Sequence, residues 1–89
     1  MATTLTPTET AIRTFLIEDV LYDKDMKNLG VDQKLLETGL LDSLSILKMV
    51  TFCEEQFGIT IPDDEVLPDN FESVRAIGQL VERVRTTSD

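Results

Sequence analysis

The sequence has 89 residues, which is long enough for one small hydrophobic core and too short for two. Hydrophobic residues make up 42% of it, a share that favours a folded domain over a disordered tail. Tryptophan is absent, so the core is expected to be mainly aliphatic. We therefore predict one compact domain over residues 1–89, with flexible ends near 1–5 and 86–89.

The chain is strongly acidic, with seventeen Asp and Glu against eight Lys and Arg and a net charge of −9. Nucleic acid and anionic membrane surfaces are disfavoured as partners, because both attract clusters of basic residues. Proteins with basic patches are favoured instead, since opposite charges speed their encounter. The alternative is that the acidity only keeps the chain soluble; in either case we expect a monomer when it is free.

Cys53 is the only cysteine, which excludes an intrachain disulfide and fits a reduced compartment. Its place in an apolar helical stripe predicts a buried side chain. The first residues lack a basic region followed by an apolar run, and no segment approaches membrane-spanning length. We therefore expect a cytoplasmic protein.

The first helix is predicted to begin after Thr6, which can cap it, with Pro7 at the first helical position. Glu9 completes a capping box with Thr6. Apolar residues then recur at helical spacing until about Tyr22, and they form one stripe: Ile12, Phe15, Leu16 and Val20.

Residues 23–41 lack a continuous helical pattern, and Asn28, Gly30 and Gly39 interrupt them. A connection of this length in a small domain is usually functional or held in place by its own side chains. Its apolar residues predict that it is pinned to the core: Val31, Leu35, Leu36, Leu40 and Leu41.

The second helix is predicted over residues 43–57, with Asp42 as its N-cap and Gly58 as its stop. At about 100° per residue, one face should be buried, and it consists of Ile46, Met49, Val50, Cys53 and Phe57. The opposite face carries two leucines among polar residues and is predicted to bind partners; it consists of Leu44, Leu47, Lys48, Thr51, Glu54 and Glu55.

The last third of the chain is predicted to be helical as well. Residues 59–61 alternate like a strand but have no second strand to pair with, whereas 62–66 resemble a short helix stopped by Pro68. Ser73 should cap the final helix, with Phe71 packed back against it. Its core face is expected to contain Val74, Ile77, Val81 and Val84.

The sequence excludes several chemistries. The chain has no histidine, so Ser43 cannot be the nucleophile of a Ser-His-Asp triad. Acidic runs beginning at Asp23 and Asp63 lack the glycine that a calcium-binding EF-hand loop requires, and one cysteine cannot build a zinc site. No glycine-rich phosphate loop is present. We expect no metal site, no catalytic residue and no enzymatic activity, so another protein must act on Ser43.

An Asp-Ser pair alone is weak evidence, because such pairs are common helix caps. Here the pair lies within Gly39–Leu44, and three further motifs follow it at Glu54–Phe57, Ile61–Asp63 and Phe71–Val74. Together these motifs resemble the acyl carrier protein family, including its peptidyl and aminoacyl relatives, over nearly the whole chain. The resemblance implies an all-α, four-helix bundle with a short third helix and a long loop between the first two helices.

The resemblance also implies that Ser43 receives covalent 4′-phosphopantetheine from coenzyme A through a phosphopantetheinyl transferase. The arm would then hold an acyl or aminoacyl group as a thioester. An acyl- or aminoacyl-loading ligase or acyltransferase would charge it, and downstream enzymes with basic docking patches would use it. By analogy, the partner-binding surface would comprise Asp42, Leu44, Leu47, Thr51, Glu54, Glu55, Ile61 and Asp63.

Ser45 and Lys48 occupy positions where many fatty-acid carriers have acidic residues. The leucine-rich attachment motif and the turn before the final helix favour a specialised polyketide or aminoacyl pathway. The alternatives are a fatty-acid carrier, an acidic helical adaptor whose Ser43 is never modified, and a small hydrolase, which the missing base disfavours.

Overall fold

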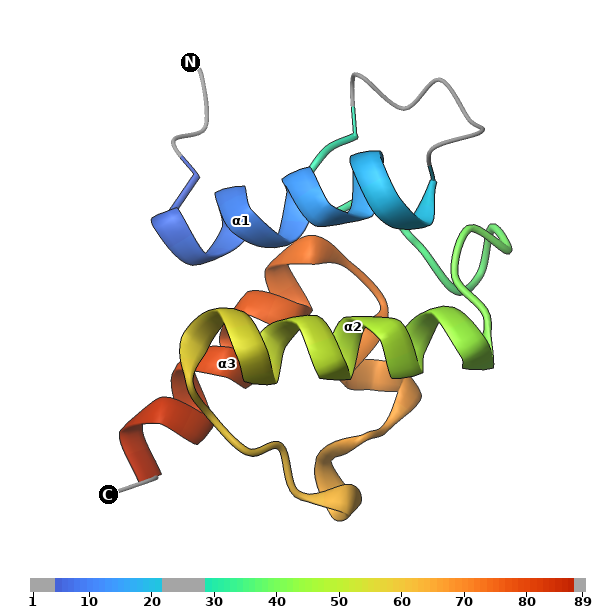
Figure 1. Ribbon diagram of the computed structural model, residues 1–89. Coiled ribbons are helices and arrows are strands. Elements are labelled where there is room, and N and C mark those ends of the chain that lie inside the picture. The colour runs from blue at the N-terminus through green and yellow to red at the C-terminus, as the bar shows by residue number, and fades with distance from the viewer. Residues whose placement is uncertain (1–4, 22–28, 88–89) are drawn as a thin grey trace.

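The computed structural model describes residues 5–21 and 29–87, and these are entirely helical or irregular, with no strand among them. Three α-helices dominate (Figure 1): α1 at Pro7–Phe15, α2 at Ser43–Phe57 and α3 at Val74–Thr87. Three short helical segments join them, which are the π-helical η1 at Leu16–Val20 and the 3₁₀ turns η2 at Asp63–Glu65 and η3 at Pro68–Phe71. The all-α prediction is confirmed.

The predicted short third helix takes a different form from the one expected. It appears as two 3₁₀ turns, so the described chain has three α-helices rather than four. Pro62 lies at the N-cap of η2 instead of inside it, and Pro68 begins η3 rather than only ending its predecessor. Proline has no N–H to donate, and the first position of a helical turn requires none.

The N-terminus of α1 forms the predicted capping box. Thr6 Oγ1 accepts a hydrogen bond from Glu9 N, and Glu9 Oε1 accepts one from Thr6 N, both at 3.0 Å. The helix continues into η1, where Leu21 N donates to Leu16 O at 2.7 Å, and both leucines are buried. The predicted end at Tyr22 lies outside the described residues.

The central helix of the core is α3. Ser73 Oγ accepts a hydrogen bond from Ala76 N at 3.1 Å, which confirms the predicted cap, and Phe71 beside it is fully buried. Gly78 lets α1 approach closely, because a Cβ added there would lie 3.2 Å from Glu9 Cγ. All predicted core residues of α3 are buried, and so is one that was not predicted: Val74, Ile77, Val81, Val84 and the additional Leu80.

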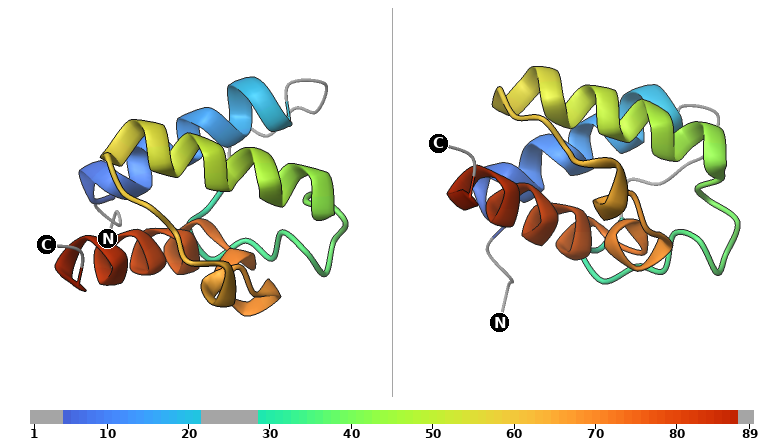
Figure 2. Two further views of the ribbon diagram at one scale, coloured as in Figure 1. Left: turned by 60° about the horizontal axis from the view of Figure 1, so that its bottom comes forward. Right: turned by 90° about the horizontal axis from the view of Figure 1, so that it is seen from below.

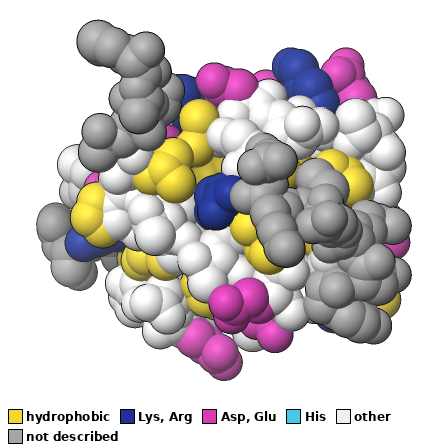
Figure 3. Space-filling view, turned by 90° about the horizontal axis from the view of Figure 1, so that it is seen from above, with side chains coloured by type: hydrophobic (Ala, Val, Ile, Leu, Met, Phe, Trp, Pro, Cys, Tyr) yellow, Lys and Arg dark blue, Asp and Glu magenta, His cyan; other side chains and the backbone are white. Residues whose placement is uncertain are grey.

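Figure 2 shows α2 beside α1, with α3 across the core from both. The outer side of α1 is seen from above in Figure 3, where the hydrophobic side chains of the described residues form separate small areas among polar ones. The apolar face of α1 is therefore turned inward, led by Ile12, which is fully buried.

The connection between the first two helices is pinned, as predicted, over its described part at 29–41, and its hydrogen bonds go to the start of α3 and the residue two before it. Leu35 N donates to Glu72 O at 2.8 Å, and Arg75 N donates to Val31 O at 2.9 Å. The Arg75 guanidinium also binds both carboxylate oxygens of Asp32, at 2.7 and 3.1 Å. Residues 23–28 lie outside the described part, and the buried residues of the remainder are Leu29, Val31, Leu35 and Leu41.

Candidate functional site: the N-terminus and outer face of α2

Ser43 is the first residue of α2, and its side chain is exposed to solvent. Asp42 has extended backbone angles, and its Oδ1 accepts a hydrogen bond from Ser45 N at 2.8 Å, which confirms it as the N-cap. The helix ends as predicted at Gly58, whose φ of 64° is a left-handed conformation that glycine adopts without steric cost. The loop and cap therefore present one hydroxyl at the start of a 15-residue helix.

Asp42 has a structural role as the cap of α2. The hydrogen bond from Ser45 N–H to its carboxylate lowers the pKa of Asp42 below the ordinary value of 3.8. Its negative charge thus persists at neutral pH and stabilises the positive end of the α2 dipole. The same dipole end lies beside Ser43, so a negatively charged group attached to that hydroxyl is tolerated there.

The two faces of α2 differ sharply in burial. Met49 and Cys53 are completely buried, as predicted, whereas the other predicted core positions are only half-buried: Ile46, Val50 and Phe57. On the outer face, Leu44 is 65% exposed and Leu47 is 58% exposed. The division of this helix into an inner and an outer face is thus present in the structure, with two exposed leucines within a turn or so of Ser43.

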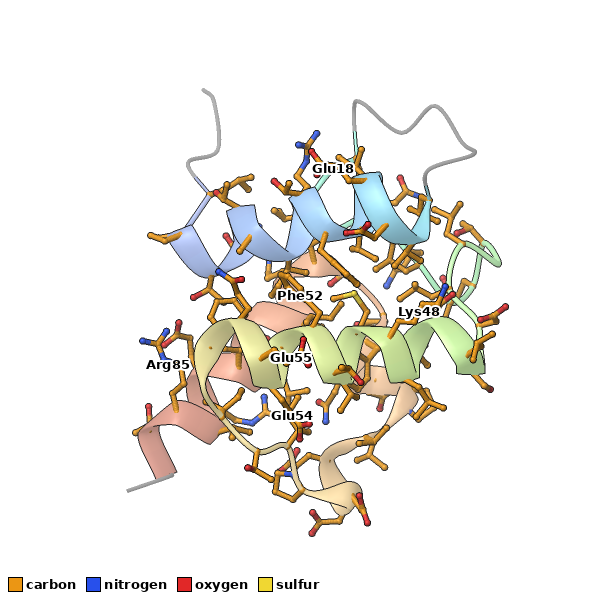
Figure 4. All side chains as sticks on the ribbon, viewed as in Figure 1. Glu18, Lys48, Phe52, Glu54, Glu55 and Arg85 are labelled. Atoms are coloured by element: carbon orange, nitrogen blue, oxygen red, sulfur yellow. The ribbon has the colours of Figure 1, made fainter. Side chains whose placement is uncertain are left out.

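Glu54 and Glu55 are adjacent in α2, but their carboxylates have different surroundings. Glu54 Oε2 accepts a hydrogen bond from Ile61 N at 2.9 Å, so its carboxylate holds the segment after α2. Figure 4 shows Glu54 and Glu55 on different sides of the helix, and Glu55 is exposed. Ile61 is only 4% exposed and belongs to the core, which corrects its predicted place on an exposed surface. Asp63 is exposed at the start of η2.

A groove of about 380 Å³ runs along the outer face of α2 where this helix meets Phe15 of α1. Phe15 and Phe52 stack inside it with ring centroids 4.2 Å apart and ring planes inclined by 14°. Sequence reasoning did not find this groove, because it placed Phe15 in the core and gave Phe52 no role. The available signal was that Phe52 lies four residues after Lys48, which places the two side chains on the same face of the helix. The lining residues are Phe15, Leu44, Leu47, Lys48, Thr51, Phe52 and Glu55.

A second groove, of about 300 Å³, begins at Ser43 on the other side of Leu47. It runs between α2 and the segment that joins η2 to η3, and its lining is apolar except for the serine. The remaining lining residues are Ile46, Leu47, Val66, Leu67 and Pro68. Ser43 therefore borders a shallow apolar surface on one side and solvent on the other.

The other reactive side chain offers no site. Cys53 is buried, and burial raises the pKa of its thiol to about 12, so the thiol is protonated at neutral pH and shielded from solvent. Within residues 5–21 and 29–87, no three His, Cys, Asp or Glu side chains are grouped so as to hold a metal ion. Asp23, the first residue of one acidic run, lies outside that part. None of the helices described is both long and apolar enough to cross a membrane.

Comparisons with known proteins agree with this geometry. A family profile described as "Phosphopantetheine attachment site" matches residues 14–81. The D-alanyl carrier protein of Streptococcus pyogenes serotype M1 is 32% identical over 77 residues, which cover 86% of this chain and 92% of that protein. The D-alanyl carrier protein of Lactobacillus delbrueckii subsp. bulgaricus is 34% identical over 60 residues, 67% of this chain and 71% of that one.

A solved structure described as "Crystal structure of FAD-dependent dehydrogenase" contains a chain that is 33% identical to this one. The two superpose with a TM-score of 0.71, over 79% of this chain and 97% of that chain. The fold of α1, α2 and α3 is therefore shared with a protein of known structure.

The helical fold presents an exposed serine at the N-terminus of α2, and the matched span of the family profile includes that residue. The chain belongs to the phosphopantetheine-attachment-site family of carrier proteins. Its prosthetic group is covalently attached 4′-phosphopantetheine. The residues fit this group: an attachment hydroxyl must be reachable by another enzyme, and Ser43 is exposed beside a helix end that tolerates a phosphate.

Proposed function

We propose that 4′-phosphopantetheine is attached to Ser43 and that the chain carries an aminoacyl group on it as a thioester. The observation that carries this proposal is the exposed position of Ser43 at the first residue of α2, within the span that matches the attachment-site family. The chain itself would perform no chemistry, because no histidine is available to activate the hydroxyl.

The attachment reaction requires a separate transferase and coenzyme A. Ser43 Oγ forms a bond to the phosphorus that bears pantetheine, and the bond from that phosphorus to the rest of the coenzyme A diphosphate breaks. Adenosine 3′,5′-bisphosphate leaves, and the hydroxyl proton passes to a base on the transferase. The α2 dipole stabilises the resulting phosphodiester charge, and Asp42 holds the helix end in place by capping Ser45 N.

When bound, the group supplies a thiol that forms the thioester with the cargo. The tether keeps the cargo at high local concentration near the enzymes that use it. An aminoacyl cargo is supported by the two D-alanyl carrier proteins that are 32% and 34% identical to this chain. The similarity to these two proteins favours an aminoacyl pathway over the polyketide and fatty-acid alternatives.

Intact-mass spectrometry after incubation with coenzyme A and a broad-specificity phosphopantetheinyl transferase tests the attachment. We expect the wild type to gain the mass of one phosphopantetheine and Ser43→Ala to gain none. Ser45→Ala is the matched control, since it removes a hydroxyl two residues away and keeps the N–H that Asp42 caps. Loading of Ser43→Ala, or no loading of folded wild type, would refute the proposal; the second result is what an unmodified acidic adaptor predicts.

The cargo is tested on protein isolated from its own cell. We expect the mass of the phosphopantetheine form plus one aminoacyl group. Hydroxylamine should remove that extra mass, because it cleaves thioesters. A fatty or polyketide acyl mass would contradict the aminoacyl assignment and leave the attachment at Ser43 intact.

A further inference from the structure

The connection between α1 and α2 passes the start of α3 before it reaches Ser43 (Figure 2). Leu35 makes its central contact, because the side chain is fully buried and the N–H donates to Glu72 O at 2.8 Å. The carbonyl of Leu35 accepts a hydrogen bond from Leu41 N at 2.9 Å, and the Leu41 side chain is buried as well. Leu41 lies two positions before Ser43 and is followed by the N-cap Asp42. One residue thus links the segment that leads into α3 with the segment that leads into α2.

Arg75 provides a second contact between α3 and this connection. The N–H groups in the first turn of a helix have no acceptor within the helix, and Val31 O supplies one for Arg75 N at 2.9 Å. The Arg75 guanidinium donates to both carboxylate oxygens of Asp32, at 2.7 and 3.1 Å. A two-point contact of this kind fixes direction as well as distance. Together with Leu35, it holds residues 31–35 against the start of α3.

The place of the first turn of α2 depends on these contacts. The hydrogen bond that Asp42 accepts from Ser45 N orders the turn internally, but it leaves the position of the turn relative to α3 open. The path of the connection bears on that position, because a single residue separates buried Leu41 from Ser43. The attachment reaction requires the hydroxyl to be aligned with phosphorus, and a misplacement of about 1 Å can slow a reaction about 100-fold.

We propose that Leu35 and Arg75 are positioning residues for the attachment reaction, an inference that rests on attachment at Ser43. Through them, α3 holds the first turn of α2 in the place from which Ser43 Oγ reaches the phosphorus of coenzyme A on the transferase. Neither residue takes part in the chemistry, because Leu35 is buried and the Arg75 guanidinium is bound to Asp32. When this support is weakened, the domain stays folded but the hydroxyl is aligned less often, so the rate of transfer within the complex falls.

The main test compares two leucines that are both completely buried. Leu35→Ala and Leu80→Ala remove the same atoms and should both lower stability, but Leu80 lies within α3 and not in the connection. Loading by a broad-specificity transferase at saturating coenzyme A is followed by intact mass, at a temperature where circular dichroism shows both variants folded. We expect Leu35→Ala to lower kcat about tenfold with KM unchanged, and Leu80→Ala to match the wild type. Leu35→Met keeps the side-chain volume and should recover most of the loss.

Arg75 is tested with variants that leave the core untouched. Arg75→Gln and Asp32→Asn each break the same ion pair, and exposed pairs contribute little to stability, so both variants should fold. We expect each to lower kcat about threefold, and the double variant to lose no more than either one, because both substitutions remove the same contact. Arg85→Gln is the matched control, since Arg85 on the same helix also pairs with an acid, Glu82, at 3.4 Å.

The same two charge variants separate positioning from attraction by charge. Arg75→Gln removes a positive charge and Asp32→Asn a negative one, so a purely electrostatic effect on the encounter would change KM in opposite directions. Opposite shifts in KM with kcat unchanged would refute the role of Arg75, whereas positioning lowers kcat in both. Amide hydrogen exchange measured by NMR is a readout without any enzyme. The N–H of Ser45, which Asp42 caps, should exchange faster in Leu35→Ala and Arg75→Gln than in their controls.

The outcomes separate the two proposals. If folded wild type is not loaded, attachment at Ser43 is refuted, and positioning with it. If wild type is loaded but Leu35→Ala keeps the kcat of Leu80→Ala, Leu35 is not a positioning residue; the same holds for Arg75→Gln against Arg85→Gln. Failure of both comparisons refutes the positioning and leaves the attachment intact. If Leu35→Ala does not fold, the arginine variants decide the proposal.

Discussion

The helices α2 and α3 have nearly equal lengths, 15 and 14 residues, but opposite roles. Five apolar side chains of α3 are buried, while α2 has two that are fully buried and two leucines that are more than half exposed. The difference arises because α3 packs against α1, η3 and the 29–41 connection, whereas Leu44 and Leu47 on the outer face of α2 are open to solvent. We therefore expect α3 to contribute most to stability, whereas the proposed attachment site and its exposed leucines lie on α2.

The largest expected effect compares the same substitution on the two helices. Leu80→Ala on α3 should lower the free energy of unfolding by about 2–5 kcal/mol, because it leaves a cavity at a fully buried site. Leu47→Ala on α2 should change it by about 0.5 kcal/mol or less, since that side chain is 58% exposed. Urea unfolding followed by circular dichroism measures both, and equal losses would contradict the division between the helices.

A smaller effect is expected within α2, between two adjacent glutamates. Glu54→Ala leaves the N–H of buried Ile61 without its acceptor and should cost about 1–3 kcal/mol. Glu55→Ala removes an exposed carboxylate with no partner in the described residues and should cost about 0.5 kcal/mol or less. Urea unfolding measures both changes. If Glu54→Ala were as stable as the wild type, the structural role of the Glu54 carboxylate would be contradicted, and its predicted role in partner binding would stand.

The smallest expected effect concerns the helix cap and depends on pH. The pKa of Asp42 is lower in the folded protein than its ordinary value of 3.8, so its ionised carboxylate stabilises the fold above that pH. This stabilisation is lost as the pH falls from 3.8 through the lower folded-state pKa. Asp42→Ala should thus lower the thermal midpoint at neutral pH and make less difference in acid.

Asp42→Asn provides the control for this prediction. Asparagine also accepts a hydrogen bond at the N-cap but does not ionise, so its thermal midpoint should lack the part of the acid dependence that Asp42 causes. An equal acid dependence in wild type and Asp42→Asn would show that other carboxylates determine it.

The sequence was most informative where the signals were local. The caps at Thr6, Asp42 and Ser73 all form as predicted, because each depends on side chains that lie within three residues of the helix start. The inward stripe of α3 followed from spacing alone. Leu80 was missed although its helical position is only about 40° from that of Val84, at the edge of the same stripe.

Errors and omissions occurred where distant segments meet. Ile61 was assigned to the surface by analogy, but the hydrogen bond from its N–H to Glu54 and its burial hold it in the core. The Phe15–Phe52 stack joins residues 37 positions apart in the sequence. No pattern along one helix reveals such a contact, because it depends on how α1 and α2 are placed relative to each other.

The sequence by itself determined the position of Ser43 at a capped helix start and the separation of exposed leucines from the core side of α2. Both follow from short-range hydrogen bonding and from the period of the α-helix. The tertiary structure alone decided which outer residues form a continuous surface. Packing placed Glu54 with Ile61 and Glu55 with the aromatic groove, since the arrangement of the helices determines which side chains of distant segments come into contact.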